Sequence, residues 1–501
     1  MKKTSLFILA ILITGVSFAQ DGFFKVYENN EKSLRPSAAI ETSDGGFIVA
    51  LYDDGGGMGE LVKLSADGAF VNRAAIDLAA DPSFNYSCID KVYLDHTGLD
   101  TYLAVGFVTS WENLVARPFI VRFDEGLDIS FRKVIKLPDE YTYCESESWL
   151  LTRNGDFLCA SSLPEGKMFY FVVDPDGDVV EMASEDVLDP YLSIGALFEH
   201  PEGGHYGHYR ESRAFGSGAK PSLFDLDGGL DSELVRQYEI IPVDTINNYI
   251  YTLHFEPIAH ATVTLLDEGT LLFSDKIREN KTLPNVITRK DWSTLLFKTD
   301  LEGNILSYHV VGSWNDTIET PATFQSFDVL NGEFAAAIYS CSSKWTGEFS
   351  DMSSLSVTKM EDSLDEIWHK TFSHPNYALQ PSYVIATSDG GCLVVGEAGT
   401  YGNYRAFALK LTSEGTVGTD EIIVSEETVF YPNPVKSRLH VKCPTESQPQ
   451  VLQIYDPQGR LVLTQGKGFE SIDMESLPAG IYTIRVVMEN GKVFSDKVVK
   501  E

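Results

Sequence analysis

The segment PSAAIETSDGGFIV at residues 36–49 recurs near the other end of the chain as PSYVIATSDGGCLV at residues 381–394. The two copies align without a gap at an offset of 345 residues. In each copy an alternating apolar run leads into the tight polar turn SDGG, and a second apolar run follows. This pattern predicts two antiparallel strands joined by a short turn.

The repeated segment is the first half of a longer unit, because a third apolar run, a second tight turn and a fourth run follow it. The first turn recurs near Gly45, Gly98, Gly155, Gly203, Gly269, Gly332 and Gly390. The second turn recurs at residues 65–68, 124–126, 174–177, 225–229, 300–303, 360–363 and 412–415. Units of four strands at steps of about 57.5 residues predict an all-β fold, a seven-bladed β-propeller. Six or eight blades remain open, since a middle repeat can be split or merged.

The ends of the repeat region predict how the ring closes. After residue 415 the last unit lacks a clear fourth strand and continues as a polar linker. The segment FFKVYE at residues 23–28 aligns, at the same 345-residue offset, with the fourth strand of the preceding unit. We therefore expect residues 23–28 to complete the last unit and remove its open edge.

Composition and the N-terminus indicate export. Residues 1–19 have two lysines, a short apolar core, and small residues at Ser17 and Ala19, which is typical of a secretory signal peptide. No later apolar stretch is long enough to span a membrane. The chain carries 73 acidic against 39 basic residues, a net charge of −34, which argues against nucleic acid as a partner. The six cysteines form no CxxC pair, and buried thiols are expected, with a Cys144–Cys159 disulfide left open.

Residues 428–501 differ from the repeats and form a separate pattern of short alternating strands with turns at Asn433-Pro434, Gly459, Gly480 and Asn490-Gly491. This pattern predicts a small Ig-like β-sandwich. The expected organisation is a signal peptide at 1–19, a propeller at 20–416, a linker at 417–427 and this sandwich at 428–501.

Three motifs of this tail carry a family resemblance: YPNPV at 431–435, YDPQGRLV at 455–462 and LPAGIYTIRV at 477–486. In order and spacing the tail resembles the C-terminal sorting domain of type IX secretion cargo in Bacteroidetes. The resemblance implies passage through the periplasm, recognition of the tail by the type IX secretion machinery, and removal of the tail near residues 420–429. It implies a secreted protein or one held at the outer-membrane surface, and nothing about the activity of the repeats.

Metal and catalytic motifs give weak signals. Asp174, Asp176 and Asp178, and likewise Asp225, Asp227 and Asp231, alternate as calcium ligands do, but both sets fall in the second turn of a unit and lack the closing Glu. The histidines His200, His205, His208, His254 and His260 lack a zinc-binding spacing. No GxSxG, P-loop or catalytic cysteine context is present. We therefore expect no metal, no cofactor and no assigned catalytic residue.

The long loops opposite the tight turns are the predicted binding face. They hold four of the six tryptophans and a concentration of basic residues in an otherwise acidic chain. Aromatic side chains on loops offer rigid contact area, and bases attract anionic groups such as uronate or sulfate. The candidate ligand-binding residues are Trp111, Trp292, Trp314, Trp345, Arg210, Arg213, Lys220, Arg278, Lys281, Arg289 and Lys290. The alternative is that each Trp packs within its own loop.

Two classes of function follow. The first is an exported, non-enzymatic propeller that binds a glycan or a protein. The second is a glycan-degrading enzyme, a hydrolase or lyase, with acidic residues at the mouth of the propeller channel. The sequence favours the first, because it contains no catalytic signature. A converging pair of carboxylates, or a cluster of His, Tyr and Arg, at the channel mouth would favour the second.

Overall fold

The structure is a computed structural model of the 501-residue chain. It describes residues 22–27, 34–53, 57–76, 84–95, 100–110, 112–138, 141, 144, 148–163, 167–186, 192–201, 203, 206–212, 222–238, 240–246, 249–255, 262–267, 269–283, 286–311, 317–342, 354–374, 377–400, 403–418, 423–425, 429–431, 435–442, 449–456, 460–466, 471–488 and 493–500. These residues form strands and turns, and none of them is helical. The predicted signal peptide lies outside this part of the chain.

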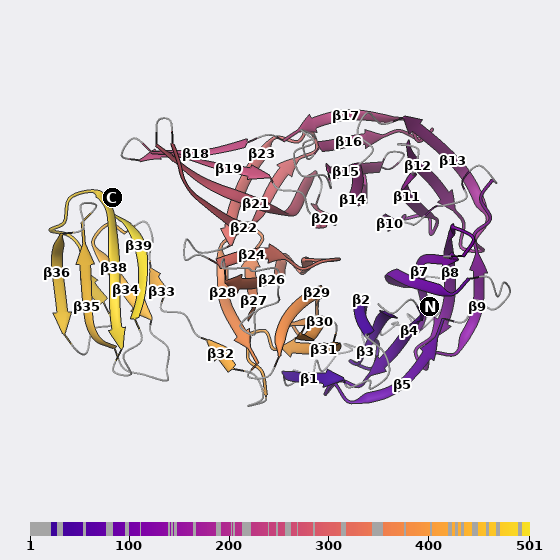
Figure 1. Cartoon of the computed structure of the whole chain (residues 1–501), viewed down its shortest axis with the longest axis horizontal. Coiled ribbons are helices and arrows are strands. Elements are labelled where there is room, and N and C mark those ends of the chain that lie inside the picture. The colour runs from indigo at the N-terminus through magenta and orange to yellow at the C-terminus, as the bar shows by residue number, and fades with distance from the viewer. Residues whose placement is uncertain are drawn as a thin grey trace, which may run out of the picture.

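Residues 22–418 form antiparallel sheets arranged around a central axis, so that the first strand of a sheet lies near the centre and the fourth lies outside (Figure 1). The first two sheets along the chain consist of β2 (Leu34–Glu41), β3 (Phe47–Asp53), β4 (Gly57–Leu64) and β5 (Phe70–Ala75), and of β6 (Tyr86–Leu94), β7 (Thr101–Ser110), β8 (Val115–Asp124) and β9 (Ile129–Val134). The third sheet consists of β10 (Ser148–Leu151), β11 (Phe157–Leu163), β12 (Lys167–Val173) and β13 (Val179–Asp186). The fourth consists of β14 (Leu192–Glu199), β15 (Tyr206–Ser212), β16 (Ser222–Leu226) and β17 (Ser232–Gln237). This is an all-β, propeller-like architecture.

The later strands continue the pattern. They are β20 (Thr262–Asp267), β21 (Thr270–Leu283), β22 (Val286–Asp300) and β23 (Ile305–Val311); β25 (Phe327–Leu330), β26 (Glu333–Ser342), β27 (Ser354–Glu361) and β28 (Glu366–Ser373); and β29 (Ala378–Ala386), β30 (Cys392–Thr400) and β31 (Asn403–Leu411). Within each group, consecutive strands pair antiparallel. The predicted order of strands along each repeat is therefore present in the molecule.

The tight turns of the described residues lie where the sequence predicts them, and the turn predicted near Gly98 falls outside these residues. In the two TSDGG segments, Gly45 and Gly390 have φ of 78° and 80°, a conformation that favours glycine. Thr42 and Thr387 each close the turn by donating a backbone N–H to the carbonyl four residues later. Gly391 has a second role, since a Cβ there would lie 2.0 Å from the Leu411 carbonyl oxygen. The TSDGG sequence therefore occurs in both segments because the geometry of the turn requires these residues.

The prediction for the N-terminal strand is confirmed. Strand β1 (Phe23–Tyr27) pairs antiparallel with β31, with Phe23 opposite Lys410 and Tyr27 opposite Ala406. The resulting sheet has the order β1-β31-β30-β29, so its outermost strand comes from the opposite end of the repeat region. Phe24 is buried and packs against Phe407, with 5.9 Å between the ring centroids. Hydrogen bonds and apolar contacts thus both tie the first strand to the last sheet.

One region predicted as a basic loop is a hairpin of long strands instead. Strands β21 and β22 pair continuously from Thr270↔Asp300 to Leu283↔Val286. Their outer part pairs with β19 (Tyr249–Phe255), which pairs with β18 (Ile240–Ile246), and Trp292 of β22 pairs with Ile318 of β24 (Thr317–Pro321). Figure 1 shows this added sheet projecting beyond the ring. The backbone hydrogen bonds of the hairpin, rather than an irregular loop, therefore hold this stretch.

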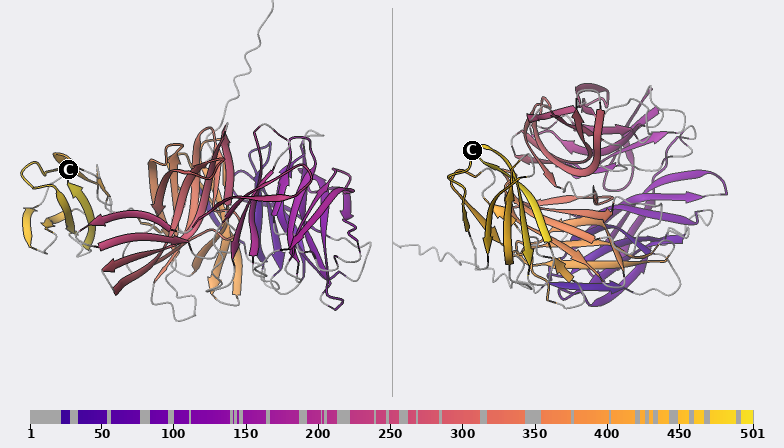
Figure 2. Two further views of the ribbon diagram at one scale, coloured as in Figure 1. Left: turned by 90° about the horizontal axis from the view of Figure 1, so that it is seen from above. Right: turned by 60° about the vertical axis from the view of Figure 1, so that its left-hand side comes forward.

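Strand β32 (Ile423–Ser425), within the predicted linker, pairs with the outer strand β28. The tail then forms two sheets, which the side views of Figure 2 show as a separate body. Its strands are β33 (Val429–Tyr431), β34 (Arg438–Lys442) and β37 (Ser471–Asp473) in one sheet, and β36 (Leu461–Gly466), β35 (Pro449–Tyr455), β38 (Gly480–Met488) and β39 (Val493–Lys500) in the other. A core of its own, including Leu439, Leu452 and Ile484, lies between them.

Buried cations link neighbouring sheets on the face that carries the tight turns. The Lys63 ammonium donates to Thr42 Oγ1 (2.6 Å) and Asp44 Oδ1 (2.8 Å) of its own sheet, and to Glu125 Oε1 (2.9 Å) of the next sheet. These bonds hold the pKa of Asp44 well below its usual range, despite partial burial. The ammonium and Glu125 are mostly buried, so their contact is stronger than a surface pair, whereas the Asp44 side chain is largely exposed.

The same position recurs in other third strands, two residues before the second turn. Lys298 donates to Asp362 Oδ1 (2.8 Å) of the following sheet, and Lys359 donates to the Gly390 carbonyl (2.9 Å). Arg122 pairs with Asp95 (2.7 Å), and Lys410 with Asp389 (2.8 Å). The last sheet is also linked to the first sheet by a contact between their turns. Ser388 donates to Glu41 through its backbone N–H (2.7 Å) and its hydroxyl (2.9 Å).

Candidate functional site

The side chains of all the predicted ligand-binding residues lie outside the described part of the structure. Trp111, Arg213, Lys220, Trp314 and Trp345 lie in segments that are not described. For Arg210, Arg278, Lys281, Arg289, Lys290 and Trp292 only the backbone is described: Arg210 is in β15, and the others are in the β21–β22 hairpin. Arg278 pairs with Trp292, Lys281 with Arg289, and Lys290 with Asn280. The hairpin thus brings five of these residues together, while the binding role stays a prediction.

The candidate calcium ligands serve the turns. Asp174 Oδ1 accepts the backbone N–H groups of Asp176 (3.0 Å) and Asp178 (2.8 Å), and Asp178 pairs with Lys133 (2.7 Å) of the preceding sheet. In the next sheet, Asp227 Oδ1 accepts the N–H groups of Gly229 (2.8 Å) and Asp231 (3.0 Å). His200 Nε2 lies 3.1 Å from Asp225 Oδ1. In the described residues no group of three His, Cys, Asp or Glu side chains could hold a metal ion.

A cavity of about 240 Å³ lies among the innermost strands of several sheets. Its walls come from β6, β10, β14 and β20, from residues 324–325 and from β29, so it lies where the sheets converge on the ring axis. Its polar lining includes Asp90, Lys91, Gln325 and Tyr383, which are far apart in sequence. The closed ring is therefore what brings these groups together, and no short motif could reveal them.

Lys91 is the cation of this channel cavity. Its ammonium donates to Gln325 Oε1 at 2.8 Å and to the Tyr383 hydroxyl at 3.3 Å, and it lies 4.9 Å from the centroid of the Tyr383 ring. The Gln325 amide in turn donates to the Val384 carbonyl (3.0 Å), which fixes its orientation. Burial lowers the pKa of Lys91 to about 8, although Asp328 and Asp90 oppose that shift. The amine is thus held in place and partly neutral just above physiological pH.

Two carboxylates, Asp90 in the cavity lining and Asp328 outside it, are close enough to this amine to affect its pKa. Asp90 Oδ2 accepts the indole N–H of Trp149 (3.2 Å), and the Tyr93 hydroxyl donates to the Trp149 carbonyl (2.9 Å). Behind the cavity, Asp328 accepts the backbone N–H of Ala386 (2.9 Å), and burial raises its pKa to about 6. The cavity therefore offers an ammonium, a carboxylate, an amide and phenols within one small space. Such a mixture of donors and acceptors suits a ligand rich in hydroxyl groups.

The comparison with protein families decides the nature of the tail. Residues 429–501 match the model of the secretion system C-terminal sorting domain. The tail is a type IX sorting domain. The resemblance read from YPNPV, YDPQGRLV and LPAGIYTIRV is thus confirmed. The sorting domain implies interaction with the secretion machinery, export, and a secreted or cell-surface location.

Comparison with curated proteins gives no sequence match. Solved structures similar to the chain include a puromycin-hydrolyzing peptidase of Mycobacterium tuberculosis (TM-score 0.44, 12% identity, 91% of this chain and 58% of that one) and the apo prolyl oligopeptidase B of Galerina marginata (0.42, 9%, 93% and 56%). A third is the β-propeller domain of the Trilobed protease from Pyrococcus furiosus, with open velcro topology (0.39, 10%, 80% and 100%). The chain spans little more than half of the two peptidases, and likenesses this low carry no argument about activity.

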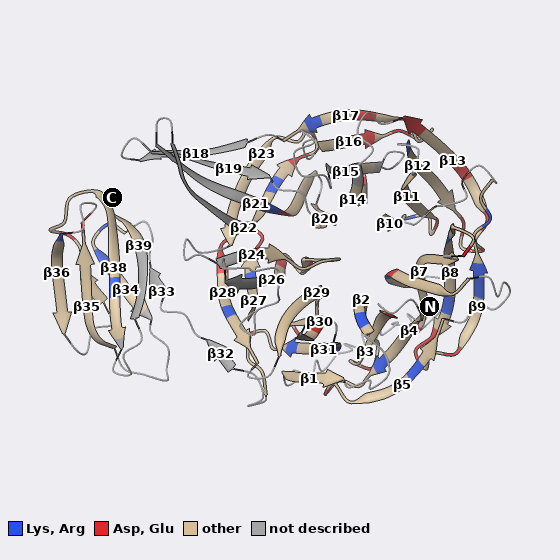
Figure 3. Cartoon of the chain, in the orientation of Figure 1, with Lys and Arg blue, Asp and Glu red and all other residues tan. Residues whose placement is uncertain are grey.

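Among the described residues, charges of both signs lie on the outer strands of the ring. Figure 3 shows acidic residues on the outer strands β13 and β17 and basic residues on β5 and β9. Among the residues that the structure describes, no helix is long and apolar enough to cross a membrane.

Proposed function

We propose that this protein is an exported, non-enzymatic binding protein: a seven-bladed β-propeller followed by an Ig-like sorting sandwich. The blade count is supported by the antiparallel pairing of consecutive strands within each predicted repeat and by β1, which completes the last one. Two of the later repeats are also joined into one 12-stranded sheet through β22 and β24. The Ig-like assignment is supported by the two small sheets of the tail around one core. The signal peptide at residues 1–19 and removal of the tail belong to the same proposal.

The ligand proposed for the channel cavity is a sugar residue of a glycan. The observation that carries this proposal is the Lys91 ammonium, fixed by Gln325 and Tyr383 in a cavity that Asp90 also lines. A sugar hydroxyl both donates and accepts, so it can satisfy the ammonium and the carboxylate at once. A simple anion would gain from Lys91 but be repelled by Asp90 and by Asp328 nearby.

The size of the cavity limits the ligand. At about 240 Å³ it is smaller than the 300–1,000 Å³ that is usual for drug-sized ligands. It therefore suits one terminal sugar ring, with the rest of the glycan outside. Five of the predicted binding residues lie in the β21–β22 hairpin, which projects beyond the ring, so they are not part of the proposed channel site.

The test is isothermal titration of the full chain with neutral methyl glycosides, uronates and the corresponding glycans. Lys91→Met keeps the aliphatic stem but removes the ammonium, and should weaken binding at least tenfold, the effect of one charge-assisted hydrogen bond. Lys25→Met is the matched control, because Lys25 is exposed on β1, away from the cavity lining. Equal affinities for both variants would refute the channel site.

The same titrations test the second candidate, glycan degradation. Lys91, with its lowered pKa, and Tyr383 beside it are the groups that favour this alternative. Products should be monitored in each sample by mass spectrometry. Turnover that Lys91→Met abolishes and Lys25→Met leaves intact would make the protein an enzyme.

A further inference from the structure

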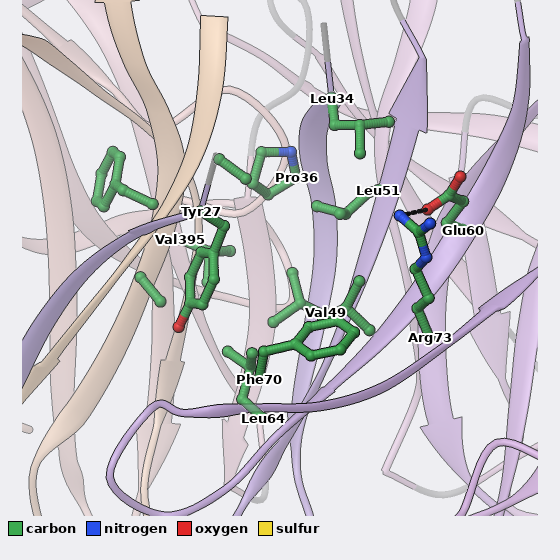
Figure 4. Close-up of a pocket in the computed structure, with 14 residues that line it drawn as sticks. Tyr27, Leu34, Pro36, Val49, Leu51, Glu60, Leu64, Phe70, Arg73 and Val395 are labelled. Atoms are coloured by element: carbon green, nitrogen blue, oxygen red, sulfur yellow. Dashed lines mark ion pairs between the residues drawn. The ribbon is translucent and has the colours of Figure 1, made fainter. Parts of the chain in front are cut away.

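A second concavity lies at the seam where the last sheet meets the first. Its volume is about 380 Å³, and its lining comes from β2 to β5 of the first sheet on one side and from β1, β30 and β31 of the last sheet on the other. Figure 4 shows apolar side chains, including Leu51, Val49 and Leu64, facing the space, and Tyr27 from β1 beside it. This seam pocket is distinct from the channel cavity, since the two share no lining residue.

Small residues of β31 explain why the pocket exists. Ala406 and Ala408 face the first sheet at the seam, and Ala408 lies two residues before Lys410. The third strands of other sheets have a larger buried residue at the position of Ala408, which is two residues before the basic residue of the strand. These residues are Leu61, Ile120, Leu296 and Val357. A larger side chain at this position fills the space between sheets elsewhere, and alanine leaves it open here. The pocket is therefore a property of the sequence at the seam.

The two charged residues of the pocket differ in exposure to solvent. Glu60 is buried, with 8% of its surface exposed, whereas the Arg73 side chain is 61% exposed. Their closest N–O distance is 4.0 Å, the outer limit of an ion pair (Figure 4). A fixed, buried carboxylate attracts a cation strongly, while an exposed arginine can turn to solvent at little cost. The net charge of −34 also favours cationic ligands over anionic ones at long range.

We propose that the seam pocket binds an amphipathic amine, with its ammonium at Glu60 and its apolar part among Leu51, Val49 and Leu64. The ammonium takes the place of the Arg73 guanidinium, which swings outward. The apolar part occupies the volume that Ala408 leaves open. Neutral alcohols of equal length lack the attraction to Glu60, and carboxylates of equal length are repelled by it.

The direct test is isothermal titration of the full chain with butyl-, hexyl-, octyl- and decylammonium, below their aggregation concentrations. Each methylene that enters the pocket should tighten binding about fourfold, until the pocket is full. Octylammonium should bind at least tenfold more tightly than octanol, and octanoate least tightly. An affinity that does not depend on chain length, or equal affinities for octanol and octylammonium, would overturn the proposal.

Three variants locate the ligand. Ala408→Leu inserts the residue that Leu61 and Leu296 provide elsewhere, so it should abolish octylammonium binding while the melting temperature stays equal or rises. Glu60→Gln should weaken binding at least tenfold, and Glu181→Gln, a matched change at an exposed acid of β13, should not. Arg73→Gln should strengthen binding several-fold, because it removes the competitor for Glu60. Unchanged binding in folded Ala408→Leu would refute the site, whatever the other variants show.

Discussion

Replacing Lys63 by Met tests the role of the buried cations in holding neighbouring sheets together. The substitution keeps most of the aliphatic stem but removes the ammonium that donates to Thr42, Asp44 and Glu125. Hydrogen bonds that involve charged groups contribute about 1.5–3 kcal/mol each when buried. Asp44 is largely exposed, so its share is discounted to that of a surface pair, below about 1 kcal/mol. The substitution also removes the cost of burying the ammonium, which offsets part of the bonds to Thr42 and Glu125, so the expected net loss is about 2–3 kcal/mol in the free energy of unfolding.

This loss corresponds to a modest change in melting temperature, because the ring is large. An unfolding entropy of about 2.1 cal/mol/K per residue gives roughly 0.8 kcal/mol/K for the ring, hence a fall of ~3 °C. Differential scanning calorimetry of the full chain measures it, with the ring transition followed separately from that of the tail. Lys133→Met is the control, since its partner Asp178 is mostly exposed and the pair should contribute less than ~1 kcal/mol. Equal shifts in both variants would show that Lys63 does not link the sheets.

Three further predictions concern the turns, the closing strand and the channel. Gly391→Ala should destabilise the ring by at least ~2 kcal/mol in a urea titration, because the new Cβ would meet a backbone carbonyl. Gly466→Ala is the control and should be neutral in the same titration, because the space around Gly466 is open. Phe24→Ala should cost about 3–5 kcal/mol and expose β1 to limited proteolysis before the other strands. The raised pKa of Asp328, about 6 against about 4 unfolded, means that the folded state retains a proton which the unfolded chain has released. The stability from this group is therefore fully present below about pH 4 and is lost as pH rises through about 6. Asp328→Asn should remove up to ~3 kcal/mol of this pH dependence from the free energy of unfolding.

The repeat and its closure could be predicted from the sequence because they depend on local geometry. A turn that needs positive φ, as at Gly45 and Gly390, leaves a glycine at a fixed interval, and strand alternation surrounds it. The segment at residues 23–28 was recognisable for the same reason, since it copies an outer strand. The tail was recognisable from its motifs.

The remaining features depend on contacts between distant segments. Lys91 and Tyr383 meet only because the ring closes, so their separation in sequence hides the channel cavity. The stretch around Arg278 falls where the sequence predicts a long loop between two strands of a unit, yet pairing with β19 and β22 makes it a strand. The buried cations do have a sequence pattern, because several repeats carry a basic residue two positions before the second turn of the unit. Lys63 is one of these residues.

The pairing of β1 with β31 sets an order of events during biosynthesis. Phe23 emerges from the ribosome roughly 390 residues before its partner Lys410. At 5–20 residues per second, that partner is missing for ~20–80 s. Throughout this time the nascent chain has two unsatisfied strand edges, one on β1 and one on the newest sheet. A second nascent chain can offer the same edges, so exchange of β1 between two molecules competes with closure of one, and low local chain concentration favours the monomer.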